Sequence, residues 1–82
     1  MNKVKIYLFA TLRDYAGAKT LEMEISAGMT VAGLKTQLVN AYPKLAPVQE
    51  SMIAAINREY AADEQILPLD AEIAFFPPVS GG

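Results

Sequence analysis

The chain of 82 residues contains no cysteine and no histidine. Disulfide bonds are therefore excluded, and the usual zinc ligand sets, which rely on these two residue types, are absent. The chain also lacks a thiol nucleophile and the commonest general base of enzymes. We expect no metal site. If the protein takes part in a reaction, the carboxylate at the end of the chain is the obvious remaining candidate for the reacting group.

An excess of charge of one sign and long apolar runs are also lacking. Seven basic and nine acidic residues give a net charge of −2, which argues against a nucleic-acid-binding protein, since such proteins carry a basic patch. No apolar run approaches the length of a membrane span. The run 6–12 is short and interrupted by Thr11, which is typical of a strand rather than of a signal peptide. We therefore expect one soluble, cytoplasmic domain that binds neither nucleic acid nor a membrane.

Alternation of apolar and polar residues predicts most of the strands. Residues 3–10 and 20–25 alternate with period two, so we expect them to form two strands, the second antiparallel to the first. The run 52–56 is low in charge, which suits an internal strand, and 59–61 can return beside it after a turn. Residues 72–76 should form the last strand.

Helical spacing predicts one principal helix over residues 31–41. Thr30 is a suitable N-cap, and Pro43 should end the helix because the residue before a proline avoids the α region. One sheet packed on one main helix places the domain in the α+β class. The core should contain Val4, Ile6, Leu8, Leu21, Met23, Ile25, Leu34 and Leu38.

The remaining segments predict a short helical turn and two loops. Residues 11–17 should form the turn, capped by Thr11 and ended by Gly17. Residues 44–50 should form a loop that can include one turn starting at Pro47, and residues 63–70 should be mostly loop. The second loop offers further apolar side chains to plug the core, namely Ile66, Leu67 and Leu69.

The last residues form the most distinctive stretch of the chain. An apolar strand ends at Phe76, and Pro77, which has no N–H, should stop the sheet pairing there. We expect a folded domain over 1–76 and an extended tail over 77–82. From Pro78 onward the tail could reach about 16 Å, and its Gly-Gly tip is thin and free of side chains. Frayed termini and expression scars can also end in glycines, so it is the order of strand, prolines, spacer and Gly-Gly that indicates a function.

Three segments resemble a known family. They are 8–17 (LFATLRDYAG), 55–60 (AINREY) and 72–82 (EIAFFPPVSGG), and they are similar to the small subunits of molybdopterin synthase, which are sulfur carriers of the ubiquitin-like β-grasp fold. The resemblance spans nearly the whole chain, and the Pro-Pro-Val-Ser-Gly-Gly ending is its most specific part. The family usually has a glycine in the turn before the last strand, where this chain has Asp70 followed by Ala71. Asp70 is a residue type that can adopt the left-handed conformation of such a turn.

The resemblance implies a sulfur carrier without catalytic side chains of its own. In the family, an ATP-dependent enzyme of the ubiquitin-activating type adenylates the C-terminal glycine, here Gly82. Sulfur then replaces oxygen to give a thiocarboxylate (1-thioglycine). The tail, including Gly81, inserts into the large synthase subunit and donates sulfur to the cyclic pterin precursor of the molybdenum cofactor. The implied partners are this large subunit, in a heterotetramer, and the adenylating enzyme. No cofactor is expected to stay bound, because the nucleotide is used by the activating partner.

Aromatic residues away from the core face predict a partner-binding surface. Phe9 lies opposite the core face of its strand, Phe76 ends the last strand and Tyr60 lies beside a turn. Such residues are enriched at interface cores and hot spots, although each could instead cover an edge of the core. The resemblance favours the partner-binding interpretation for Phe9 and Phe76, and both interpretations stay open for Tyr60. The tail residues expected to contact partners are Pro77, Pro78, Val79 and Ser80.

Three other functions are compatible with this type of fold and tail. A sulfur carrier of the thiamin pathway also ends in Gly-Gly, although the FATLR start and the double proline count against it. A ubiquitin-like protein modifier shares the activation chemistry and is joined to a substrate lysine. An interaction module of the same fold with an inert tail is disfavoured only by the tail motif. Intact mass from native cells separates these classes: a sulfur carrier exchanges one oxygen for sulfur, a modifier forms covalent adducts, and an inert module does neither.

Overall fold

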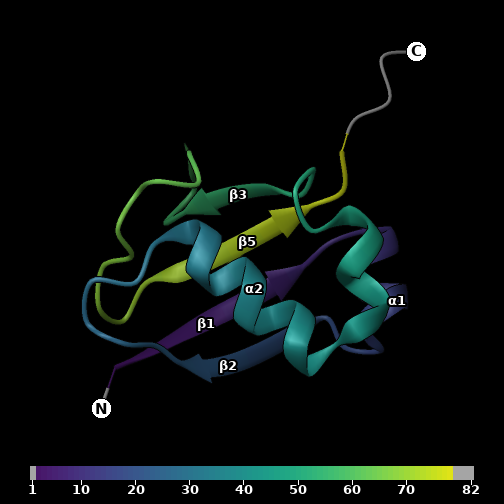
Figure 1. Ribbon diagram of the computed structural model, residues 1–82, viewed down its shortest axis with the longest axis horizontal. Helices are drawn as coiled ribbons and strands as arrows, with labels where there is room; N and C mark the ends of the chain where they lie inside the picture. The colour runs from purple at the N-terminus through teal and green to yellow at the C-terminus, as the bar shows by residue number, and fades with distance from the viewer. Residues whose placement is uncertain (1, 79–82) are drawn as a thin grey trace.

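The computed structural model describes residues 2–78, which form one mixed five-stranded sheet with helices on one of its faces (Figure 1). In chain order the elements are β1 (Lys3–Leu8), α1 (Thr11–Ala16), β2 (Thr20–Glu24), α2 (Val31–Ala41), the 3₁₀ helix η1 (Pro43–Val48), β3 (Ile53–Ile56), β4 (Glu59–Ala61) and β5 (Glu72–Phe76). The sheet order is β2-β1-β5-β3-β4. The first and last strands pair in parallel at the centre, and the other neighbours are antiparallel. The predicted α+β class is confirmed.

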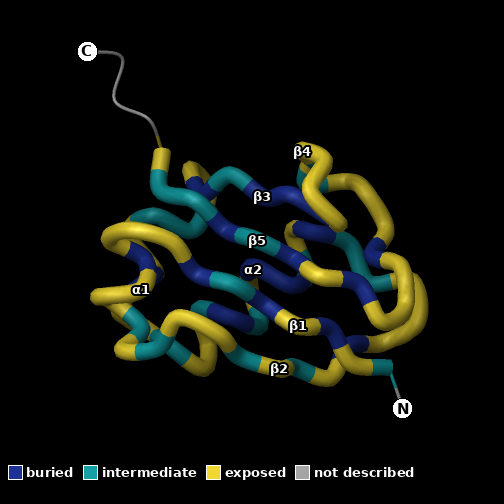
Figure 2. The backbone as a smooth tube through the Cα atoms, turned by 180° about the vertical axis from the view of Figure 1, so that it is seen from behind, coloured by how far each residue is buried: buried dark blue, intermediate teal, exposed yellow. Residues whose placement is uncertain are grey.

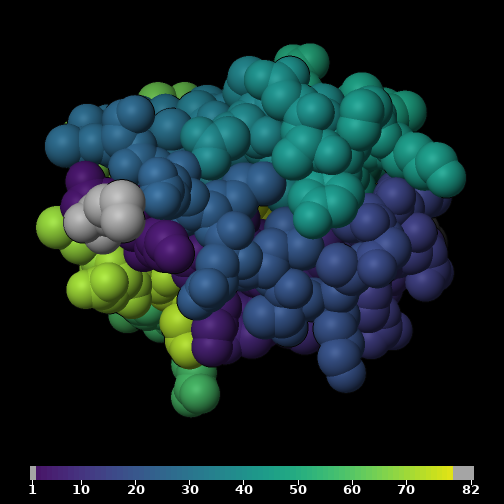
Figure 3. Space-filling view, turned by 90° about the horizontal axis from the view of Figure 1, so that it is seen from below, coloured from purple at the N-terminus to yellow at the C-terminus, as the bar shows by residue number. Residues whose placement is uncertain are grey.

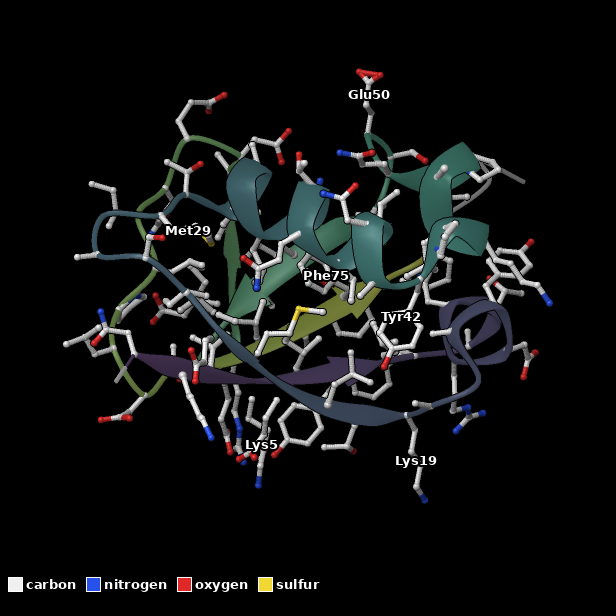
Figure 4. The ribbon with its side chains drawn as sticks, turned by 60° about the horizontal axis from the view of Figure 1, so that its bottom comes forward. Lys5, Lys19, Met29, Tyr42, Glu50 and Phe75 are labelled. Carbon is white, nitrogen blue, oxygen red and sulfur yellow. The ribbon has the colours of Figure 1, made fainter. Side chains whose placement is uncertain are left out.

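Helix α2 packs across one face of the sheet, and the core lies between these two layers. The view onto the β2 edge shows the helical layer stacked on the strands (Figure 3). Phe75 lies between α2 and the sheet, whereas Lys5 points to the opposite side (Figure 4). The predicted core residues are buried, except for Leu21 and Met23, which are partly buried because β2 is an edge strand.

Two loop residues that were expected to plug the core do not do so. Leu67 is buried, but Ile66 and Leu69 are 61% and 60% exposed. Ile66 forms an isolated antiparallel bridge with Thr30, and this backbone pairing places the next residue, Leu67, in the core. The expectation for Ile66 and Leu69 was therefore wrong.

The helix termini follow the sequence in part. The Thr30 hydroxyl accepts a hydrogen bond from the Gly33 N–H at 3.2 Å, which confirms the predicted N-cap of α2. Gly17 ends α1 in the left-handed conformation, as expected. Thr11 is the first residue of α1 rather than its cap, because the N-cap is Ala10 and no side chain caps this end. The segment after α2, predicted as a loop, begins with the 3₁₀ helix η1.

Positive φ angles mark two turns that border β5. Asp70 has φ 58°, so it adopts the left-handed conformation directly before the last strand, as its residue type allowed. Asn57 and Arg58 have φ 48° and 76°, and they form the tight turn between β3 and β4. In the part of the chain that the structure describes, no helix is both long and apolar enough to cross a membrane.

Candidate functional site

Within the described residues, no helix packs on the face of the sheet opposite α2 (Figure 2). Side chains of a strand alternate between the two faces, so each strand presents its second set of residues here. The burial of β1 and β5 follows this alternation, with buried residues toward α2 and exposed or partly buried residues on the uncovered face. We call this surface the open face.

An aromatic pair lies at the C-terminal end of β5 on the open face. The Phe9 N–H donates to the Phe75 carbonyl oxygen at 3.2 Å, which keeps Phe9 beside β5 although β1 has ended at Leu8. The rings of Phe9 and Phe76 then stack with centroids 4.8 Å apart and an interplanar angle of 13°. Phe9 is 43% exposed. The structure thus brings these two predicted residues together on one surface.

A row of four residues crosses the middle of the open face. Cross-strand pairing places Tyr7 beside Ala74, Ala74 beside Ala55, and Ala55 beside Tyr60. The two central side chains are methyl groups, and the two outer ones are phenol rings, so the row is low in the centre. Tyr60 is 82% exposed. The result is an open concavity of ≈ 450 Å³, lined by Tyr7, Phe9, Ala55, Arg58, Tyr60, Glu72, Ala74 and Phe76. We call it the alanine trough.

The end of the trough away from the phenylalanines is polar. The Tyr7 hydroxyl donates to the Glu72 carboxylate at 3.2 Å. The Glu72 N–H donates to the Asn57 side-chain oxygen at 3.0 Å, and the Asn57 N–H donates back to the Glu72 carbonyl oxygen at 2.8 Å. These bonds fix the β3–β4 turn beside β5, and Arg58 of that turn lines the trough. The trough therefore offers an aromatic end, an apolar floor and a charged end.

The tail begins at the aromatic end of the open face. Strand β5 ends at Phe76, as the proline stop predicted; Pro77 is partly buried and Pro78 is exposed. Val79, Ser80, Gly81 and Gly82 were also predicted as site residues, and they lie outside the described residues. The described end of the chain thus adjoins the Phe9–Phe76 pair.

The lining of the alanine trough is mainly aromatic and apolar. Within residues 2–78, no group of three or more acidic side chains could hold a metal ion. Of the lining residues, three were predicted as site residues from the sequence, namely Phe9, Tyr60 and Phe76. The other five were not predicted, namely Tyr7, Ala55, Arg58, Glu72 and Ala74. Period-two counting back from Phe76 reaches Ala74, so part of this signal was present in the sequence. Alanine carries no functional signature of its own, and Arg58 enters only through the turn geometry.

The chain is similar to known proteins over nearly its whole length. A family model described as the ThiS family matches residues 6–82. The molybdopterin synthase sulfur carrier subunit of Arabidopsis thaliana is 34% identical over 80 residues, covering 98% of this chain and 83% of that protein. The corresponding subunit of Chlamydomonas reinhardtii is 33% identical, covering 98% of this chain and 99% of that protein.

Solved structures agree with the fold. The crystal structure of small archaeal modifier protein 1 from Haloferax volcanii matches with a TM-score of 0.87 and 28% identity, covering 96% of this chain and all of that one. The expected ubiquitin-like β-grasp fold and the resemblance to molybdopterin synthase small subunits are thereby confirmed. Because the family model matches from Ile6 to the last residue, the chain belongs to the ThiS family.

Proposed function

We propose that this protein is the sulfur carrier subunit of a molybdopterin synthase. The observation that carries the proposal is the full-length similarity to subunits of that name, 34% and 33% identical, with a family match that includes the Gly-Gly ending. The uncovered aromatic face that adjoins the start of the tail supports it. A carrier needs such a face to bind its partners while its tail enters their active sites.

The proposed reaction takes place at the carboxylate of Gly82. This group is ionised at neutral pH and resists nucleophiles. Its oxygen attacks the α-phosphorus of ATP, pyrophosphate leaves, and an acyl-adenylate forms on the activating enzyme. A hydrosulfide ion supplied by a donor then attacks the acyl carbon and AMP leaves, which gives the thiocarboxylate after loss of the sulfur-bound proton. The large synthase subunit transfers this sulfur to the cyclic pterin precursor.

The composition indicates which proteins supply the catalytic groups of the proposed reaction. A chain without cysteine and histidine supplies neither a thiol nor an imidazole for these steps. The activating enzyme and the large subunit therefore provide the catalytic groups, and this protein provides the acyl group that carries sulfur. Two glycines without side chains suit a narrow channel leading to each active site.

The open face is the proposed binding surface for the large subunit and the activating enzyme. Phe9 and Tyr60 are exposed and Phe76 is partly buried, and aromatic residues are of the kind that dominate binding energy. The alanine trough between Tyr7 and Tyr60 suits an apolar side chain that projects from a partner. Arg58 at the charged end of the trough suits a partner carboxylate.

Two tail variants test the position of the reacting group. Gly81→Ile should abolish or strongly reduce formation of the acyl-adenylate, because a branched side chain does not fit a channel made for glycine. One residue appended after Gly82 should have a stronger effect, because it displaces the carboxylate from the nucleotide. Circular dichroism should show an unchanged fold for both. An appended variant that still becomes a thiocarboxylate without trimming would show that the reacting group is elsewhere.

A second candidate is a protein modifier. The match to small archaeal modifier protein 1, with a TM-score of 0.87 over the whole of that chain, favours it. A modifier forms an amide bond between its C-terminal acyl group and a substrate lysine, whereas a carrier gives up sulfur and regains its carboxylate. Incubation with the activating enzyme, ATP, a sulfur donor and cell extract separates the two, because only a modifier yields conjugates that survive denaturing electrophoresis under reducing conditions.

A further inference from the structure

A buried lysine lies on the core side of α2. Lys35 is 4% exposed, and its ammonium group donates to the Met52 carbonyl oxygen at 2.7 Å. The same group forms an ion pair with the Asp63 carboxylate at 2.9 Å, and it is the only ion pair within residues 2–78. A lysine is seldom buried unless it is paired and hydrogen-bonded. The two contacts satisfy this requirement. The positions of Met52 and Asp63 in the chain then show which segments the lysine joins.

The two partners of Lys35 lie at the two ends of one hairpin. Met52 directly precedes β3, and Asp63 follows the end of β4 by two residues. The ammonium group therefore joins the entry of the β3–β4 hairpin to its exit and holds both against α2. The exit is held a second time, because the Ala32 N–H at the start of α2 donates to the Asp63 carbonyl oxygen at 3.0 Å.

The hairpin has few other attachments to the sheet. Strand β4 is an edge strand of three residues, so the hairpin joins the sheet through the pairing of β3 with β5 and through the two hydrogen bonds between Asn57 and Glu72. Yet the hairpin supplies Ala55, Arg58 and Tyr60 to the alanine trough, and β1, the adjoining Phe9 and β5 supply the other lining residues. The shape of the trough thus depends on how the hairpin sits relative to β5.

We propose that Lys35 is a positioning residue that sets the β3–β4 hairpin, and with it Tyr60 and Arg58, for partner binding on the opposite face of the sheet. The ion pair is weak evidence for a stabilising role, because well-packed apolar residues often replace buried ion pairs without loss of stability. A bonded ammonium group, in contrast, specifies the place of two separate chain segments. The part that concerns partner binding rests on the proposed function.

The first test uses the free protein and needs no partner. Lys35→Met keeps the length of the side chain and removes both contacts. Amide hydrogen exchange should rise by about tenfold or more at residues 53–61, relative to the amides of β1 and β5. Leu12→Val, a core change in α1 with no part in the hairpin, is the control and should not show this local pattern. A rise spread evenly over the sheet, or none, would overturn the proposal.

The second test measures affinity for the purified cognate large subunit at a temperature where every variant is folded. Lys35→Met should weaken binding about tenfold, but by much less in a Tyr60→Ala background, because the lysine acts through the hairpin. Leu12→Val should leave affinity unchanged. Equal losses in both backgrounds, or no loss in either, would overturn the positioning role.

The two tests separate the inference from the proposed function. If the wild-type protein does not bind the large subunit, the proposed function fails, and hydrogen exchange still decides whether Lys35 holds the hairpin. If Lys35→Met does not fold, Asp63→Ala replaces it in both tests, because it removes one of the two contacts from a side chain that is 46% exposed. The results that support or overturn the proposal are then the same as those given for Lys35→Met.

Discussion

Two consecutive phenylalanines of β5 should have separable effects on stability and on partner binding. Phe75 is fully buried between α2 and the sheet, whereas Phe76 points to the open face and stacks on Phe9. The two residues share a strand and a residue type, so each is a matched control for the other. Phe76→Ala should therefore act mainly on affinity, and Phe75→Leu mainly on stability.

The magnitudes follow from these surroundings. Phe76→Ala removes an aromatic stack worth about 0.5–1.5 kcal/mol of stability. At a binding hot spot the same change costs about 2 kcal/mol or more, which is roughly a 30-fold loss of affinity. Phe75→Leu should cost about 1–2 kcal/mol of stability, within the usual range for a core substitution, and leave affinity nearly unchanged.

Urea unfolding measures the first quantity, and titration calorimetry with the large subunit measures the second. Both should be carried out well below the unfolding temperature of every variant. Two results would contradict this separation: Phe76→Ala binding as tightly as the wild type, or Phe75→Leu losing as much affinity as Phe76→Ala. Either result would mean that the open face is not the contact surface.

Three further changes test single features. Asp70→Gly should raise the melting temperature by about 2–5 °C, because glycine adopts φ 58° more easily, and a lower temperature would show that the Asp70 side chain contributes there. Ala74→Leu should fill the trough and weaken binding about tenfold without unfolding the protein, whereas Ala32→Leu, on the exposed side of α2, should bind normally. Thr30→Ala should lower the free energy of unfolding by about 1 kcal/mol, through loss of the bond from the Gly33 N–H, and Thr30→Ser should retain most of it; equal losses would contradict the capping role.

Local patterns in the sequence were sufficient for most of the elements. Alternation located β1 and β2, and the Thr30 cap with Pro43 bounded α2, because these signals depend on near neighbours in the chain. Ile66 and Leu69 could not be placed in this way. Their segment has no period, and the backbone bridge of Ile66 to Thr30 decides which of its side chains turn inward.

Sequence patterns predicted only part of the open face, because the rest of it depends on pairing between distant segments of the chain. Phe9 was found because the alternation places it opposite the core residues Ile6 and Leu8, and Phe76 was found because it ends the last strand. The trough requires the parallel register of β1 with β5 and the antiparallel register of β3 with β5, which join residues far apart in the sequence. Lys35 did give a signal that was overlooked, since it falls at helical spacing between Val31 and Leu38 on the buried side of α2.

The most direct test of the sulfur-carrier function is a reconstitution with the thiocarboxylate form of this protein. The thiocarboxylate is incubated with a large synthase subunit and the cyclic pterin precursor, while molybdopterin and the intact mass of the carrier are followed together. We predict that molybdopterin forms as the carrier mass returns from the sulfur-containing to the oxygen-containing value. A carrier that keeps its sulfur while no molybdopterin appears, with a large subunit that is active with its own carrier, would contradict the proposed function.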